Sequence, residues 1–176
     1  FKKRYGKSYI DLEEKNKIQF LKSQLISKKN VINKFKFKNK ENNEVWSTFK
    51  ILADEPPECL GAYVISMTTS ASDILSVLFL QKEAKIKDKL RVVPLFETLD
   101  DLINAKDIMK SLFSQSWYRR LIKNNQEVMI GYSDSSKDAG KICANWHQYK
   151  AQEEIVKLSK RFNINVPFFH GRGGSA

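Results

Sequence analysis

The chain has 176 residues, of which 41% are hydrophobic and 29% are charged, as in an ordinary globular domain with a sizeable core. It has no run of eighteen apolar residues, which argues against a membrane-spanning segment. Its two cysteines, Cys59 and Cys143, fit neither a metal-binding spacing nor a disulfide framework, so we expect idle thiols in the reducing cytoplasm. The first residues lack an initiator Met and an apolar signal core, and we interpret the chain as a fragment or a processed piece.

The formal net charge is +11, and most of it lies in residues 1–50, where fourteen Lys and Arg face five Asp and Glu. A basic segment can indicate a nucleic-acid or membrane surface as partner. Here the basic residues are mostly Lys mixed with Asn and Ile, without a basic and aromatic recognition motif. We interpret the charge as a solvated face with a variable loop, and expect neither nucleic acid nor membrane as a partner.

Residues 1–59 are predicted to form a helical segment that precedes the main domain. Apolar residues recur at helical spacing over 12–26 and again over 44–53, and the pair Pro56-Pro57 ends the second helix. The residues between them, 27–43, are basic and rich in Asn, which predicts a loop.

Residues 60–176 alternate between short apolar runs and longer helical patterns. The predicted strands are 62–67, 90–96, 127–132 and 165–169, and the predicted helices are 71–84, 99–122 and 137–162. This alternation is typical of βαβ units in a parallel sheet, either doubly wound or part of a (β/α)8 barrel. A full barrel needs eight strands and roughly 250 residues, so four strands would form about half of one. In the last helix we expect Trp146 and Tyr149 to pack in the core.

Two carboxylates follow neighbouring strands. Glu97 comes directly after the second predicted strand, and Asp134 comes shortly after the third. Because ligands bind at the carboxyl ends of parallel strands, this pair suits Mg²⁺ or Mn²⁺, which prefer hard oxygen ligands. The pattern fits equally well with two residues that cap the following helices. Spacing alone leaves both interpretations open.

A Gly-rich turn follows the fourth predicted strand and carries His170, Arg172, Gly173 and Gly174. Glycines allow close backbone approach, an Arg binds phosphate or carboxylate through two donors, and a His donates hydrogen bonds or moves protons. Lys137, at the start of the last helix, would also favour an anion. The alternatives are a tight turn with a surface Arg, and a solvated Lys.

Several strings, taken together and in this order, resemble the phosphoenolpyruvate carboxylase family. They span residues 60–67, 92–99, 128–140 and 169–175, with shorter matches at 117–119 and 149–153. The most specific are Leu-Phe-Glu-Thr around Glu97, Tyr-Ser-Asp-Ser-Ser-Lys-Asp at 132–138 and Phe-His-Gly-Arg-Gly-Gly-Ser at 169–175. The resemblance is close over 60–175 and loose over 1–59.

This resemblance implies an α/β fold that is part of a (β/α)8 TIM-type barrel, with residues 60–176 as the partial barrel. It also implies a cytoplasmic homotetramer that converts phosphoenolpyruvate and bicarbonate to oxaloacetate and phosphate with Mg²⁺ or Mn²⁺. Glu97 and Asp134 would be the metal ligands. The substrate and catalytic groups would be His170, which helps to place bicarbonate, Arg172, which contacts the phosphate, and Lys137, Gly173 and Gly174.

Other motifs of the family are not in this chain. A catalytic His in a Thr-Ala-His-Pro string and a second Gly-Arg-Gly-Gly run are both missing from the 176 residues. We therefore expect the isolated chain to be inactive. The alternative is a non-catalytic or degenerate copy that acts as a structural or interaction piece.

Overall fold

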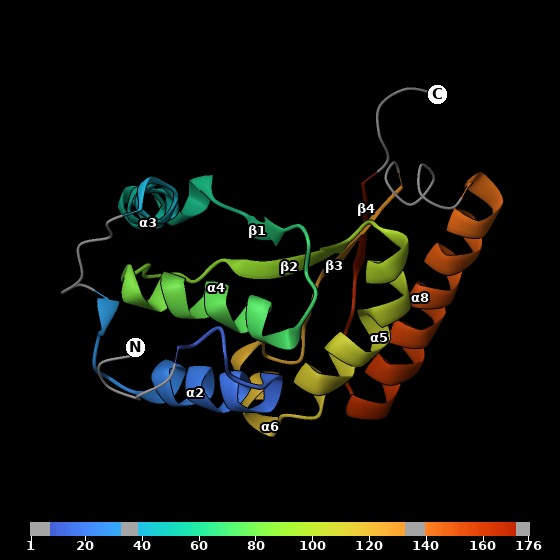
Figure 1. The fold of residues 1–176 in the computed structure, drawn as a ribbon, viewed down its shortest axis with the longest axis horizontal. Helices are drawn as coiled ribbons and strands as arrows, with labels where there is room; N and C mark the ends of the chain where they lie inside the picture. Colours follow the sequence, from blue (N-terminus) through green and yellow to red (C-terminus); the bar gives the residue numbers. More distant parts are fainter. Residues whose placement is uncertain (1–7, 33–38, 133–139, 172–176) are drawn as a thin grey trace. The chain divides into compact units, whose positions relative to one another are not determined.

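The computed structural model of the protein describes residues 8–32, 39–132 and 140–171 (Figure 1). The chain forms two compact units, Phe1–Gly61 with Ser72–Leu90, and Ala62–Ala71 with Arg91–Ala176. The division after residue 59 that the sequence suggested stays a prediction. Within the described ranges, no helix combines the length and the apolar character that crossing a membrane requires.

The first unit contains α2 (Glu14–Ile26), α3 (Lys40–Asp54), the short 3₁₀ helix η2 (Pro57–Cys59) and α4 (Ala71–Glu83). The predicted loop 27–43 is too long at its end, because α3 begins at Lys40. Asn39 caps this helix, since its side chain accepts a hydrogen bond of 2.8 Å from the backbone N–H of Glu41. The apolar side of α3 buries Trp46 and Phe49.

Hydrogen bonds at both ends join α2 to α4. At their first turns, the Glu14 carboxylate accepts from the backbone N–H and the hydroxyl of Ser72, both at 2.8 Å. At the other end, the Lys82 ammonium donates to the Gln24 carbonyl at 2.5 Å and to the Lys29 carbonyl at 3.2 Å. Because the first turn of α2 bonds to the first turn of α4, and the last turn of α4 bonds to the end of α2, the two helices run parallel (Figure 1).

The second unit is built on four parallel strands, as the sequence predicted. They are β1 (Ala62–Ile65), β2 (Arg91–Phe96), β3 (Val128–Gly131) and β4 (Phe168–Gly171), and they lie in the order β1-β2-β3-β4. Each strand therefore pairs with the next one along the chain. The result is an α/β sheet consistent with part of a barrel.

The helices that follow β2 and β3 lie together on one face of this sheet. After β2 come α5 (Leu99–Phe113) and α6 (Ser116–Leu121), and after β3 comes α8 (Lys141–Phe162). Figure 1 shows α5 and α8 side by side, and they are in extensive contact. Beneath them, Phe96, Val128 and Ile130 are fully buried. Helices that touch each other must cover the same face, so the crossovers from β2 to β4 all pass over one side.

Three predictions about the second unit need correction. The expected helix 99–122 is divided into α5 and α6, with Ser114 as the C-cap of α5 and the Gln115 carbonyl accepting the first bonds of α6. The last strand is Phe168–Gly171 and not 165–169, because its ladder with β3 extends through His170 and Gly171.

Trp146 and Tyr149 are the third correction. They are 56% and 58% exposed, so the expectation that they pack in the core is wrong. Their rings lie 6.1 Å apart at 33°, and the Lys150 ammonium lies 5.6 Å from the Trp146 ring. They therefore form an exposed aromatic and basic cluster on α8.

Candidate active site at the strand ends

Glu97 is the first residue after β2, and its backbone is held by the start of α5. The Thr98 side chain caps this helix by accepting from the Asp101 N–H at 3.1 Å. In return, the buried Asp101 carboxylate accepts from the N–H groups of Thr98 at 3.1 Å and Glu97 at 3.3 Å. Thr98, and not Glu97, is therefore the N-cap of α5, and Glu97 lies one residue before it, near the positive end of the helix dipole. Its side chain is partly buried.

The end of β3 offers Glu97 a neighbour without a side chain. Leu95 pairs with Met129 and Phe96 with Ile130, so Glu97 lies opposite Gly131. A Cβ atom on Gly131 would come within 2.6 Å of the Glu97 Cβ atom and 3.1 Å of its Cα atom. Only glycine permits this close approach of the two strand ends.

A buried glutamine from α8 fixes the same strand end. The side-chain amide of Gln148, which is 3% exposed, donates a hydrogen bond of 3.1 Å to the Gly131 carbonyl. Buried amide groups of this kind are nearly always paired. Gln148 therefore ties the carboxyl end of β3 to the helix that covers the sheet.

Tyr132 and His170 form a pair at the ends of β3 and β4. The Tyr132 hydroxyl oxygen lies 2.8 Å from Nδ1 of His170, and the rings are 5.8 Å apart at 52°. His170 is exposed and Tyr132 is partly buried. The prediction put His170 after the strand, but it lies inside β4, where it pairs with Ile130.

The candidate residues reach this edge from opposite faces of the sheet. Partners in a parallel ladder share a face, and successive residues alternate between faces. Glu97 therefore shares a face with Gly131 and Gly171, whereas Tyr132 and His170 share the face of Ile130, which the helices cover. All of them still lie at the carboxyl edge, where ligands of parallel sheets bind.

The remaining predicted site residues lie outside the described residues. They are Asp134, Lys137, Arg172, Gly173 and Gly174. The pairing of Glu97 with Asp134 and the phosphate contact of Arg172 therefore stay predictions. Within the parts of the chain that the structure describes, no three His, Cys, Asp or Glu residues are grouped so that they could hold a metal ion.

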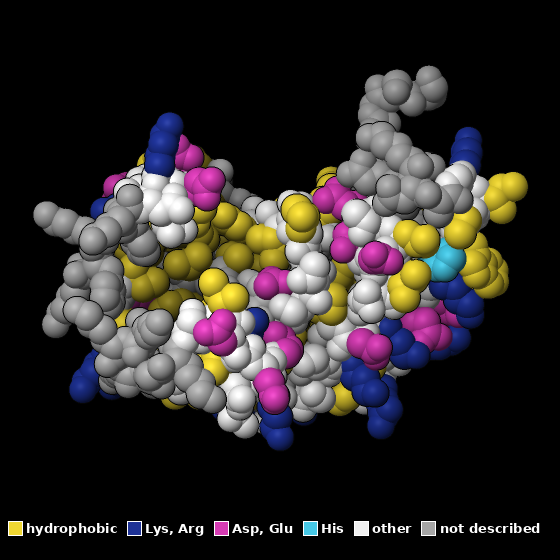
Figure 2. All heavy atoms as spheres, viewed as in Figure 1, with side chains coloured by type: hydrophobic (Ala, Val, Ile, Leu, Met, Phe, Trp, Pro, Cys, Tyr) yellow, Lys and Arg dark blue, Asp and Glu magenta, His cyan; other side chains and the backbone are white. Residues whose placement is uncertain are grey.

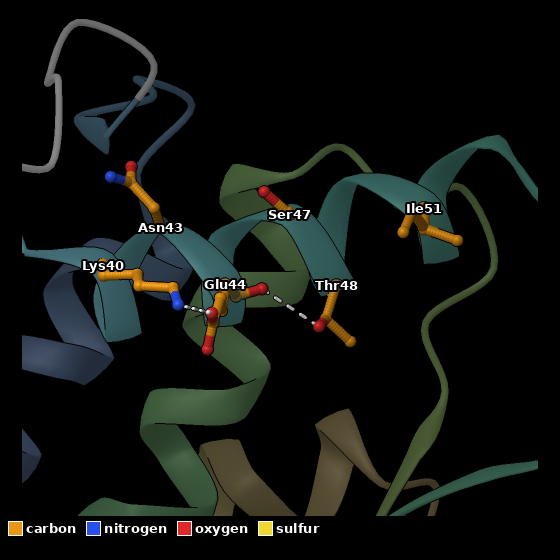
Figure 3. A pocket seen from close by; sticks show the side chains of 6 residues that line it. All are labelled: Lys40, Asn43, Glu44, Ser47, Thr48 and Ile51. Atoms are coloured by element: carbon orange, nitrogen blue, oxygen red, sulfur yellow. Dashed lines mark hydrogen bonds and ion pairs between the residues drawn. The ribbon is translucent and has the colours of Figure 1, made fainter.

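Two hollows elsewhere on the surface do not have the character of an active site. Figure 3 shows one along the exposed side of α3, where Lys40 pairs with Glu44 at 3.9 Å and the Thr48 hydroxyl donates to the Glu44 carbonyl at 3.1 Å. These are contacts within one solvated helix. The other is a groove of about 340 Å³ between α5 and α8, in the part of Figure 2 where hydrophobic and basic side chains gather.

The groove between α5 and α8 is crossed by an ion pair between Lys106 and Glu154. The hydrogen bond from Lys106 holds the pKa of the Glu154 carboxyl below its ordinary value, and the same bond raises the pKa of Lys106. The His147 ring lies beside them and is bound to its own helix, with Nδ1 2.9 Å from the Cys143 carbonyl. His147 is therefore an ordinary residue of the helix face.

Sequence reasoning missed Tyr132, Gln148 and Gly131 as parts of the site. Tyr132 had a usable signal, because it directly follows a predicted strand and precedes Asp134 by two residues. Gly131 had a weaker signal, since a glycine at a strand end often marks a close backbone approach. Gln148 had none, because only the packing of α8 against β3 gives its amide a partner.

A parallel α/β unit with polar residues gathered at the carboxyl ends of its strands belongs to the class of α/β proteins that bind ligands at that edge. The comparison with known families is specific: the family model of phosphoenolpyruvate carboxylase matches residues 2–176. The chain therefore belongs to the phosphoenolpyruvate carboxylase family.

Individual relatives agree with this assignment. The chain is 48% identical over 170 residues to phosphoenolpyruvate carboxylase 3 of Arabidopsis thaliana, which covers 97% of this chain and 18% of the relative. It is 50% identical over 168 residues to the C4 phosphoenolpyruvate carboxylase of Flaveria trinervia, a match that covers 96% of this chain and 17% of the relative. It is 58% identical over 132 residues to the phosphoenolpyruvate carboxylase of Acinetobacter baylyi, a match that covers 75% of this chain and 15% of the relative. The chain thus spans less than a fifth of the length of these relatives.

Proposed function

We propose that the protein to which this chain belongs converts phosphoenolpyruvate and bicarbonate to oxaloacetate and phosphate. The phosphoryl group leaves the enol oxygen for bicarbonate, which gives the enolate of pyruvate and carboxyphosphate. The C–O bond of carboxyphosphate then breaks to release phosphate and carbon dioxide, and C3 of the enolate attacks the carbon dioxide to form the new carbon–carbon bond. The observation that carries the proposal is the family match over residues 2–176, supported by the names of the relatives. The proposal concerns the whole protein, because this chain corresponds to only a small part of it.

The chain would contribute the ligands of a divalent cation, Mg²⁺ or Mn²⁺, through Glu97 and Asp134. The described residues fit this role in one respect: Glu97 directly follows β2, and its backbone N–H is held at the edge by the Asp101 carboxylate at 3.3 Å. Carboxylate oxygens are the ligands that these hard cations prefer. When bound, such a cation supplies positive charge that stabilises the charge developing on phosphoryl and enolate oxygens.

The Gly-rich segment after β4 would bind the anionic parts of the substrates. Arg172 would hold phosphate through two parallel donors, and the amides of Gly173 and Gly174 would add further donors to it. His170 would help to place bicarbonate, and Lys137 would add positive charge to the same edge. Together these groups would exclude water from the phosphorylated bicarbonate, which water would otherwise hydrolyse.

The architecture proposed for the whole protein is a closed (β/α)8 barrel in a cytoplasmic homotetramer. The strand order of this chain supports it, because β1 to β4 follow one another without reversal. One sheet face also carries Val64 and Phe169, which are 47% and 53% exposed. In a closed barrel the inner face is filled by side chains from the remaining strands.

The test is oxaloacetate formation by the full-length protein with phosphoenolpyruvate, bicarbonate and Mg²⁺. Replacing Glu97 by Gln keeps its size and removes its charge, so kcat/KM should fall at least about a hundredfold and the Mg²⁺ requirement should rise. Asp100→Asn is the matched control, because Asp100 is an exposed carboxylate on the first turn of α5, three residues away. Unchanged kinetics of Glu97→Gln would remove the metal assignment, and absence of oxaloacetate in the wild type would remove the proposed reaction.

A further inference from the structure

We infer that Tyr132 is a positioning residue that fixes the ring of His170 for the proposed carboxylation. The inference rests on the proposed function and adds a residue that the resemblance did not assign. It starts from one contact, in which the Tyr132 hydroxyl oxygen lies 2.8 Å from Nδ1 of His170.

The backbone explains why these two side chains meet. His170 pairs with Ile130, and Tyr132 follows Ile130 by two residues, so both side chains leave the sheet on the same face. Gln148 holds the Gly131 carbonyl, one residue before Tyr132. The ring of Tyr132 therefore starts from an anchored strand end and reaches across to the neighbouring strand.

The contact determines which nitrogen of His170 is available to a substrate. A tyrosine hydroxyl can donate to Nδ1, and the neutral imidazole then carries its proton on Nε2. Because His170 is exposed, Nε2–H is free to donate to an oxygen of bicarbonate. Without the hydroxyl, the ring would lose both its fixed orientation and its preference for this tautomer.

The perturbation is Tyr132→Phe in the full-length protein, with Tyr149→Phe as matched control. The control removes the same hydroxyl from an exposed ring on α8, which is 58% exposed and remote in sequence from the strand ends. A single hydrogen bond of this kind changes an equilibrium roughly three- to tenfold. We expect kcat/KM for bicarbonate to fall by about this factor in Tyr132→Phe, with KM for phosphoenolpyruvate unchanged.

A double-mutant cycle with His170→Gln separates positioning from a general structural effect. If Tyr132 acts through His170, Tyr132→Phe should change nothing further in the His170→Gln background. An equal fall in both backgrounds would overturn the inference and leave the proposed function standing. If His170→Gln is too slow to measure, the single variant decides: equal losses for both substrates, or none, overturn the inference. Full activity of His170→Gln would instead remove the role proposed for His170 itself.

Discussion

The close approach of Glu97 and Gly131 makes Gly131→Ala the most informative single change. The new methyl group would lie 2.6 Å from the Glu97 Cβ atom, 3.1 Å from its Cα atom and 3.3 Å from a methyl group of Leu95. Ordinary carbon contacts begin near 3.5 Å, so β2 and β3 must separate by about 1 Å at this end. Neither the Cβ atom nor the Cα atom of Glu97 can move away without moving the strand.

The expected cost has two parts, one in stability and one in activity. Overpacking of this size destabilises a fold by about 1–3 kcal/mol. A displacement of about 1 Å at a catalytic group costs roughly a hundredfold in rate. In the full-length protein, Gly131→Ala should therefore lower the melting temperature and reduce kcat/KM for oxaloacetate formation. It should also raise the Mg²⁺ concentration that gives half-maximal rate, if Glu97 is a metal ligand.

Two other glycines provide matched controls for Gly131→Ala. A Cβ atom on Gly61 would meet nothing within 4 Å, so Gly61→Ala should behave as wild type. A Cβ atom on Gly171 would lie 2.5 Å from the terminal methyl group of Met129, which can rotate away, so its effect should be smaller. Wild-type stability and Mg²⁺ dependence in Gly131→Ala would refute the reasoning. Equal losses at Gly61 would show that the assay does not report on this contact.

Two predictions concern contacts away from the site. The buried Glu83 carboxylate accepts hydrogen bonds from the N–H groups of Val31 and Ile32, both at 2.5 Å. Glu83→Gln should therefore speed the hydrogen exchange of these two amides several-fold. Unchanged exchange would mean that the charge of Glu83 contributes nothing to the stability of these two hydrogen bonds. Lys106 lowers the pKa of the Glu154 carboxyl. This pair therefore stabilises the fold at every pH above the ordinary pKa of glutamate, and the stabilisation is lost as the pH falls through the lowered pKa. In thermal melts, Glu154→Gln should accordingly be less stable than wild type at pH near 7 and indistinguishable from it at pH near 3. A difference in melting temperature that stays the same at every pH would contradict this.

The sheet was predictable because its strands are buried on the helix side and carry long apolar runs. The runs around Val92 and Ile130 are such segments, and the structure has strands there. The end of β4 was not predictable in this way, because His170 and Gly171 are not apolar. Their place in the strand comes from backbone pairing with Ile130 and Gly131, which any side chain tolerates. The start of α3 was missed although Asn39 is a good N-cap, since the surrounding Lys and Asn residues obscured the helical pattern.

The sequence predicted that the candidate site lies at the carboxyl edge of the sheet. It did not predict which side chains contact one another there. The sequence predicts that Glu97 and His170 lie at the carboxyl ends of two strands, and the structure has both residues there. The face on which each side chain lies depends on register, and a shift by one residue exchanges the faces. The sequence did not determine this register, so it could not show that Glu97 and His170 lie on opposite faces of the sheet.

The order of the four strands is consistent with part of a barrel, one of the two folds that the sequence left open. A doubly wound sheet reverses its order at a switch point, so that helices lie on both faces and the ligand binds where the order turns. Over four strands this chain shows no reversal, and α5 and α8 share one face. Right-handed crossovers that always lead to the next strand keep adding helices to the same side, and the sheet's twist then curves it toward closure. The face opposite α5 and α8, on which Val64 and Phe169 are exposed, is the one that closure would bury. Glu97 shares that face, so the proposed barrel puts its carboxylate at the inner rim.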